Sequence, residues 1–467
     1  MSQAKITISD AIMGSGKSLN IKNLISNSNV TIDKYLVITP FLGELHRIAQ
    51  TTPRPIKKGE SKKLLGKTPP LRDRKKSIIY NSPEYDKESC IKNFRFKQPE
   101  VRNASGSKKD SLLYLLDNKE NIVSTHQLYQ TFDKDSFKNC KNYTLIIDEA
   151  ISVYETYREL SAKVVREQIT LGNMYLDKDG ITIRLSSLFN TDGIGNVTDH
   201  TFNIKDYKNL CDDGNLLLLH NSVVMWKLPK ELFSSFKEVI ICTYQFRGSI
   251  LEAFLRQNNF KYEIKCWGKK PSSIAHLINI YDGNLNQNTD DTMFNYGWYG
   301  NYKNIDYAKK TLNNYFKSAN PCSSKDRIWS CYGTTLIDNK TIEDVDILVG
   351  TAQFKTQWLA YNTKATNNFS DRHNIAYMVN IHYKPAIKDL IYKIYTKLET
   401  ESDKQYKNRI KLQEELYAIN EMIQFIWRSA IRNGEPVNVF IPSKRMRILL
   451  QKWLKDEYES YRTALSV

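Results

Sequence analysis

The stretch KITISDAIMGSGKSLNIKNLI, residues 5–25, decides the fold of this chain. Its first part alternates β-branched and small polar residues, which predicts a short buried strand. The small residues Gly14, Ser15 and Gly16 then form a loop, and an apolar-patterned helix begins at Lys17. In a strand–loop–helix unit of this kind, backbone N–H groups at the helix start point at an anion, which the helix dipole also favours. We therefore predict a phosphate-binding loop.

The residue types in this loop predict individual roles. Lys17 would reach the β- and γ-phosphates of a nucleotide, and the Ser18 hydroxyl would hold Mg²⁺. The usual pattern G-x-x-x-x-G-K-[ST] begins with glycine, whereas this chain has Ala11 at that position. A Gly-Ser turn before an ordinary helix is the alternative interpretation. The predicted nucleotide-binding residues are Gly14, Ser15, Gly16, Lys17 and Ser18.

A second apolar strand ends in two carboxylates. In NYTLIIDEAISVYE, residues 142–155, the run LII is followed by Asp148 and Glu149. A carboxylate at a strand end can hold Mg²⁺ through water, and its neighbour can orient and deprotonate an attacking water. A lone Asp-Glu after a strand is more often a helix cap. Because a phosphate-binding loop precedes it in this chain, we favour the catalytic interpretation.

Three further apolar strands also end in small polar residues. They end at Thr39-Pro40 within residues 35–48, at Thr125-His126 within residues 121–132, and at Thr243 within residues 238–255. Such strand ends can present hydroxyl and N–H groups to a phosphate, although ordinary strand-to-helix turns look the same. The continuous apolar runs and the strand–helix alternation predict an α/β chain with parallel sheets.

Composition bounds the class of protein. The chain has 467 residues, enough for two or three domains, and is 41% hydrophobic. Its net charge of +17 favours a polyanionic partner, chiefly nucleic acid, although a low-GC genome also enriches lysine. Seven scattered cysteines without a C-x-x-C pair favour a reducing compartment, with no disulfide framework and no zinc site.

We expect a cytoplasmic protein, in the host cytoplasm if the chain is viral. The N-terminus leads directly into the first strand, leaving no room for a signal peptide. No apolar run of about 18 residues predicts a membrane span, so we expect no membrane partner.

Two segments interrupt the first half. Residues 50–110 are rich in Lys, Arg, Pro and Gly, and residues 155–235 are mixed in character, so we interpret both as insertions. In the second half, residues 262–267 and 276–281 predict strands of a second domain. Residues 387–432 read as largely helical, and Gly434 would end that helix. Within it, Gln424, Arg428 and Arg432 would share one face, which indicates either an interdomain arginine finger or an ion-paired surface.

The order of these segments resembles that of the superfamily 2 helicase motifs. GSGKS, LVITPFL, VSTHQL, IIDEA, ICTYQ, NTKATN and QFIWRSAIR follow one another across nearly the whole chain. The resemblance is closest to bacteriophage-encoded DNA helicases. It implies two tandem RecA-like domains, residues 1–255 and 256–467. The arginine finger helix would then lie at about 418–433.

The resemblance also implies residue roles. It assigns catalysis to Lys17, Glu149, Gln424, Arg428 and Arg432. It assigns to Thr243 the coupling of ATP hydrolysis to nucleic-acid binding. Nucleic-acid contacts would come from Thr39, Pro40, Thr125, His126 and Thr363. One departure leaves the arginine finger undecided between Arg428 and Arg432: Trp427 stands where the family usually has glycine, and the second Arg is one place late.

We therefore expect an ATP-dependent helicase or translocase that uses ATP and Mg²⁺. We expect single-stranded or forked DNA as its substrate, and protein partners from a replication or recombination complex. The alternative is the ATPase motor of a viral DNA-packaging, terminase-like machine without a nuclease domain. A binding module that has lost turnover is a third interpretation, which the intact Lys17, Asp148 and Glu149 disfavour. The sequence does not decide whether the substrate is DNA or RNA, or whether the protein unwinds a duplex or only translocates. It also leaves open the polarity of translocation and the oligomeric state.

Overall fold

A computed structural model describes most of the chain: residues 4–29, 31–40, 48, 96–100, 107–132, 134–186, 205–287, 290–337, 340–363 and 368–463. The chain forms two compact units. The first comprises Met1–Thr7, Gly16–Ala150 and Glu231–Cys242, and the second comprises Ile8–Ser15, Ile151–Lys230 and Thr243–Val467. The predicted boundary after residue 255 stays a prediction.

The larger sheet in the described part of the chain has seven strands in the order β12-β1-β11-β5-β2-β4-β3. The neighbouring pairs β11–β5, β5–β2, β2–β4 and β4–β3 are parallel. Leu145, Ile146 and Ile147 are fully buried in β5, as their continuous apolar run predicts. The strands are β1 (Lys5–Ala11), β2 (Lys34–Thr39), β3 (Phe96–Lys97), β4 (Asn121–Thr125), β5 (Tyr143–Asp148), β11 (Glu238–Thr243) and β12 (Tyr262–Trp267).

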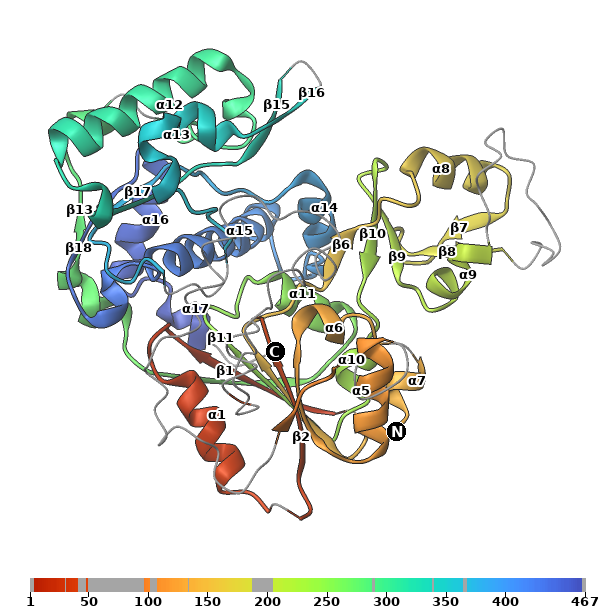
Figure 1. Cartoon of the computed structure of the whole chain (residues 1–467). Helices are drawn as coiled ribbons and strands as arrows, with labels where there is room; N and C mark the ends of the chain where they lie inside the picture. The colour runs from red at the N-terminus through yellow and green to blue at the C-terminus, as the bar shows by residue number, and fades with distance from the viewer. Residues whose placement is uncertain are drawn as a thin grey trace, which may run out of the picture. The chain divides into compact units, whose positions relative to one another are not determined.

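Helices follow the strands of this sheet, as the βα pattern predicts (Figure 1). Helix α1 packs through Ile21 and Ile25 in a core that also holds Val37, Val123 and Ile146. The helices are α1 (Lys17–Ser26), α5 (Lys108–Asp117), α6 (His126–Tyr129), α7 (Lys134–Phe137), α10 (Glu231–Ser234) and α11 (Ile250–Gln257).

An α+β insertion lies between β5 and β11. Antiparallel pairs β6–β10, β10–β9 and β7–β8 form it together with two helices (Figure 1). Leu216 and Leu218 bury one side of β9 against Val165 of α8 and Cys211 of α9. Its elements are β6 (Tyr154–Thr156), α8 (Ala162–Thr170), β7 (Met174–Leu176), β8 (Ile183–Leu185), α9 (Lys205–Asp212), β9 (Leu216–Leu219) and β10 (Val223–Lys227).

A second parallel sheet occupies the C-terminal half, with the order β13-β18-β17-β14. Its strands are β13 (Ile278–Ile280), β14 (Arg327–Ser330), β17 (Asn374–Tyr377) and β18 (Val437–Phe440). The long helix α15 (Asp403–Ile426) contributes Ile419, Met422 and Ile423 to the core of this sheet. The other α-helices of this half are α12 (Tyr302–Asn314), α13 (Val345–Phe354), α14 (Pro385–Ile394), α16 (Lys444–Leu454) and α17 (Glu459–Thr463), and β15 (Thr334–Ile337) with β16 (Lys340–Glu343) forms a hairpin.

These sheets confirm the predicted α/β fold class, with a parallel sheet in each half and an insertion in the first half. Strand β12, which we predicted in the second domain, falls in the second unit and is an edge strand of the seven-stranded sheet. Its alternation of exposed and half-buried residues suits an edge. In the described part of the chain, no helix is long and apolar enough to span a membrane.

Candidate functional site

The predicted phosphate-binding loop has the backbone that its glycines allow. Gly14 and Gly16 have φ angles of 77° and 85°, a left-handed conformation that side chains disfavour. Gly16 is the N-cap of α1 and makes no side-chain cap hydrogen bond to the first turn, and helix N-termini of this kind favour anions. Ser15 Oγ is buried without a hydrogen-bond partner among the described residues. Lys17 is the first, half-buried residue of α1.

The strand-end residues share one edge of the seven-stranded sheet. In the registers of its parallel pairs, Thr39 lies opposite Thr125 and Asp148 lies opposite Cys242, the residue before Thr243. Because these strands are parallel, their carboxyl ends lie at the same edge. The sheet therefore brings Thr39, Thr125 and Asp148 to one edge, where ligands of open α/β sheets bind.

Glu149 has a strained backbone directly after this edge. Its φ angle is 64°, and its N–H donates to the carbonyl of Cys242 at 2.9 Å. A non-glycine residue in the left-handed region costs of order 1–3 kcal/mol, and such residues cluster at functional sites. The Asp148 and Glu149 side chains are both half-buried, so neither is sealed in the core.

The other strand-end residues have structural partners. His126 Nε2 lies 3.0 Å from the backbone carbonyl oxygen of Asp148, which ties the end of β4 to the end of β5. Thr125 is the N-cap of α6, and its Oγ1 accepts a hydrogen bond from Leu128 N–H at 3.3 Å. Thr39 is fully buried and Pro40 is half-buried. Nucleic-acid contacts by these residues stay predictions.

The helix predicted for residues 418–433 was too long. Helix α15 ends at Ile426, so Gln424, Arg428 and Arg432 do not share a helical face. An α-helical ladder would join Ala430 N–H to the carbonyl of Ile426, but that N–H donates to Arg372 O at 2.9 Å instead. The carbonyl of Ile426 accepts the Ser429 hydroxyl at 2.6 Å.

The two candidate arginines therefore differ in environment. Arg428 is only 3% exposed, whereas Arg432 is exposed on a 3₁₀ turn, Ala430–Asn433, which Gly434 ends with a φ of 81°. In the second unit, a Cβ built on Gly14 would lie 4.0 Å from the carbonyl oxygen of Arg432, so this turn borders the first part of the loop.

Two other predicted residues have ordinary local partners. Gln424 Nε2 donates to Asn420 Oδ1 at 3.0 Å, one helical turn back along α15. Thr363 is half-buried, and its N–H donates to Ala360 O at 3.0 Å. The Ser18 side chain, residues 364–367 of the NTKATN segment and most of the basic segment 50–110 lie outside the described residues.

A buried ion pair beside the loop was not predicted from the sequence. Asp10 in β1 is fully buried, and its carboxylate accepts the N–H groups of Gln245 and Phe246, both at 3.0 Å. Arg462 of α17 donates from Nη1 to Asp10 Oδ1 at 3.3 Å. Burial alone would lower the pKa of Arg462, but a hydrogen bond to Glu459 and the charge of Asp10 raise it above its ordinary value. A charged residue inside the loop's strand was the available signal.

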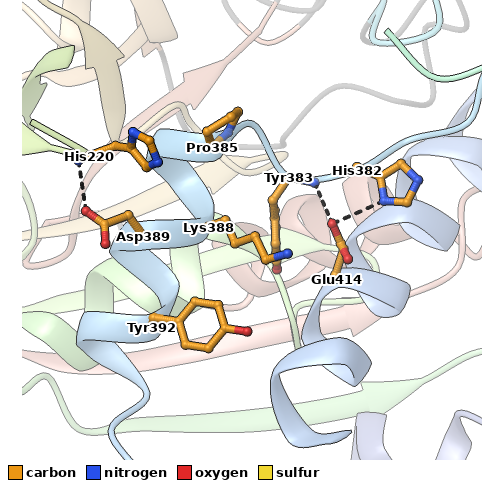
Figure 2. A pocket seen from close by; sticks show the side chains of 8 residues that line it. All are labelled: His220, His382, Tyr383, Pro385, Lys388, Asp389, Tyr392 and Glu414. Atoms are coloured by element: carbon orange, nitrogen blue, oxygen red, sulfur yellow. Dashed lines mark hydrogen bonds and ion pairs between the residues drawn. The ribbon is translucent and has the colours of Figure 1, made fainter. Parts of the chain in front are cut away.

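A pocket of about 430 Å³ lies elsewhere in the second unit, between the β9–β10 turn and helices α14 and α15. Figure 2 shows Asp389 and Tyr392 on α14, with Glu414 on α15. Both carboxylates are already bonded: Asp389 Oδ2 accepts His220 N–H at 2.9 Å, and Glu414 Oε1 accepts Tyr383 N–H at 2.9 Å and lies 3.4 Å from His382 Nδ1. Burial alone would raise the pKa of Glu414, but these hydrogen bonds lower it.

Known proteins are similar to this chain in sequence. The family described as "YonV C-terminal Rossmann-like domain" matches residues 272–454. The SPbeta prophage-derived uncharacterized protein YonV of Bacillus subtilis (strain 168) is 27% identical over 478 residues, which cover 97% of this chain and 99% of the relative.

Three solved structures match most of this chain, each at 10% identity or less and with a TM-score below 0.5. Mss116p (NTE and C-tail double deletion), bound to ssRNA and AMP-PNP, is 10% identical with a TM-score of 0.35, over 97% of this chain and 69% of that chain. The DUF1998 helicase MrfA, bound to DNA and AMPPNP, is 8% identical with a TM-score of 0.31, over 99% of this chain and 48% of that chain. A DEAD box protein from the hyperthermophile Methanococcus jannaschii is 10% identical with a TM-score of 0.24, over 97% of this chain and 86% of that chain.

Proposed function

We propose that this chain is a nucleic-acid-dependent ATP hydrolase of the helicase or translocase type. The observation that carries the proposal is the strained Glu149, directly after Asp148 at the carboxyl edge of a parallel sheet, in a chain whose first strand leads through two left-handed glycines into α1. Strain of this kind persists only where surrounding structure imposes it. A catalytic carboxylate explains why the chain retains it.

The residues present suit a nucleotide with Mg²⁺. The uncapped N-terminus of α1 and the buried, unsatisfied Ser15 Oγ offer donors to phosphate oxygens, and Lys17 adds a positive charge there. Ser18 and Asp148 would hold the cation, which when bound neutralises charge on the β- and γ-phosphates. Glu149 would accept a proton from the attacking water, and the His126 bond to the Asp148 carbonyl holds this strand end in place.

Arg432 is our choice for the arginine finger. Its side chain is exposed, and its carbonyl borders Gly14 of the loop. Arg428 is buried and suits packing instead. An arginine that stabilises the transition state in this way is worth about 10³–10⁵ in rate in related nucleotide enzymes.

Two observations support a nucleic-acid partner: the net charge of this chain and the prophage origin in the name of the similar Bacillus subtilis protein. The net charge of +17 favours a polyanion, and contacts to its backbone would be independent of sequence and sensitive to salt. The name of the similar Bacillus subtilis protein refers to a prophage, which supports a phage setting and hence DNA replication or recombination. We propose DNA, single-stranded or forked, as the substrate.

The test measures ATP hydrolysis by the full chain with single-stranded DNA, duplex DNA, forked DNA or RNA, side by side at one salt concentration. We expect Mg²⁺-dependent turnover that single-stranded or forked DNA stimulates more than RNA does. Stronger stimulation by RNA would overturn the choice of DNA. No turnover with any of the four would overturn the enzymatic proposal, and metal-dependent DNA cleavage would favour the packaging-motor alternative.

A further inference from the structure

The turn after Thr243 is held by a side chain from another strand. Gln245, in this turn, has a φ of 52°, which a residue with a side chain rarely adopts. The carboxylate of Asp10 accepts the N–H groups of Gln245 and of the next residue. Two hydrogen bonds to one carboxylate fix both peptide planes, so Asp10 imposes the strained turn.

The charge on Asp10 is itself compensated by distant residues. A buried carboxylate is costly unless it is paired and hydrogen-bonded. Arg462 donates to Asp10 Oδ1 and also to its backbone carbonyl at 3.2 Å, and its guanidinium lies 5.8 Å from the ring centroid of Tyr244. The Tyr244 hydroxyl accepts Trp453 Nε1–H at 2.8 Å. Helices α16 and α17 therefore support one buried carboxylate in β1.

Asp10 lies next to two segments of the proposed site. It directly precedes Ala11, where the phosphate-binding motif begins, and it holds the turn that follows Thr243, the expected coupling residue. Its neighbour Ser9 also accepts a hydrogen bond, from Trp267 Nε1 at 2.8 Å, so this end of β1 is fixed on several sides.

We propose that Asp10 is a positioning residue that holds the turn after Thr243 at a fixed place beside the strand that enters the loop, with Arg462 as its counter-charge. The proposal rests on the proposed function, because it assigns Asp10 to coupling within that site. It predicts that the carboxylate affects turnover more than nucleotide affinity, since Asp10 bonds to backbone groups rather than to a nucleotide.

The experiment compares Asp10→Asn, Arg462→Gln and the double variant, all in the full chain. The asparagine side chain has one acceptor oxygen, and its NH₂ group cannot accept a hydrogen bond. One of the two hydrogen bonds from the Gln245 and Phe246 N–H groups is therefore lost. Glu252→Gln is the matched control. Glu252 is also a buried carboxylate, bonded to Arg247 Nη1 at 2.6 Å and to Gly248 N–H at 2.9 Å, and in the described part of the chain its hydrogen-bond partners lie within residues 247–262 rather than in β1. Hydrogen exchange at the Gln245 and Phe246 amides reports on the turn independently of catalysis.

We expect Asp10→Asn to speed exchange at these two amides about tenfold or more. It should lower DNA-stimulated kcat by about 10- to 100-fold, while KM for ATP changes by less than about threefold. The double variant should lose less activity than the sum of the single variants, because it buries no unpaired charge. Glu252→Gln should lower the melting temperature, but it should not lower kcat selectively while leaving KM for ATP unchanged.

Unchanged exchange at both amides in folded Asp10→Asn would overturn the positioning role, whether or not the wild type hydrolyses ATP. A wild type without turnover but with faster exchange in Asp10→Asn would overturn the proposed function alone. If Asp10→Asn does not fold, Arg462→Lys and Arg462→Gln carry the test. Arg462→Lys should then retain most of the DNA-stimulated kcat that Arg462→Gln loses. An equal loss of kcat in both variants would overturn the role of Arg462 as the counter-charge.

Discussion

Two acidic sites lie near the ends of strands of the same seven-stranded sheet, and their surroundings differ. Asp10 is fully buried and bonded to two backbone N–H groups and to Arg462. Asp148 and Glu149 are half-buried at the end of β5, where Glu149 sits in a strained turn. A fully buried carboxylate that accepts backbone N–H groups can position backbone, whereas a half-buried one can contact a ligand. Burial thus separates the two roles better than residue type does.

The same contrast separates two arginines in the segment after α15. Arg428 is buried and Arg432 is exposed, although the motif treats them as equivalent candidates. If this contrast holds, a change at Arg432 should affect turnover, and a change at Arg428 should affect stability.

The largest effect is expected at the arginines. Arg432→Ala should lower kcat by about 10³-fold or more if Arg432 is the finger, with little change in melting temperature. Arg428→Ala should instead lower the free energy of unfolding by about 2–5 kcal/mol, because it removes a large buried side chain. Steady-state ATPase assays and thermal unfolding of both variants give the comparison. Loss of turnover in a stable Arg428→Ala, with Arg432→Ala active, would reverse the assignment.

A slightly smaller effect is expected at Glu149. Glu149→Gln should lower kcat by about 10²–10⁴-fold, the range for a lost general base. Nucleotide affinity and melting temperature should stay near the wild-type values, since the residue is half-buried and its backbone bond to Cys242 is kept. Single-turnover hydrolysis and calorimetry measure these quantities. Wild-type turnover in this variant would show that another group activates the water.

The smallest effect is expected at a half-exposed charge cluster just before strands β14, β17 and β18 of the second sheet. His373 lies 2.8 Å from Asp326 and 2.7 Å from Glu435, and the hydrogen bond to Asp326, followed by that to Glu435, raises its pKa despite partial burial. The protonated form is therefore favoured in the folded chain. Its stabilisation should be complete below the unfolded pKa of 6.5 and should disappear as pH rises through the higher folded pKa.

His373→Gln should remove this pH dependence. The difference in unfolding free energy between wild type and variant should be below about 1 kcal/mol, because the pair is solvent-screened. It should be larger at pH 6 than at pH 9, as denaturant titrations would measure. A difference that grows with pH would contradict the assigned sign.

Much of this architecture could be predicted from local sequence pattern. Apolar runs such as Leu145 to Ile147 identify buried strands, and the glycines at 14 and 16 identify the loop, because both signals act within a few residues. The end of α15 could not be predicted, since the N–H of Ala430 bonds to Arg372 in a different segment. Asp10 was missed for the same reason: its partners Gln245 and Arg462 lie 235 and 452 residues away.

The central claim is that the loop at residues 14–18 binds the nucleotide that this chain hydrolyses. The most direct measurement is DNA-stimulated ATP hydrolysis by Lys17→Ala beside the wild type, with DNA binding measured on the same samples. We predict that Lys17→Ala loses turnover and still binds single-stranded DNA, because Lys17 serves the phosphates of the nucleotide. Wild-type turnover in a folded Lys17→Ala would contradict the account.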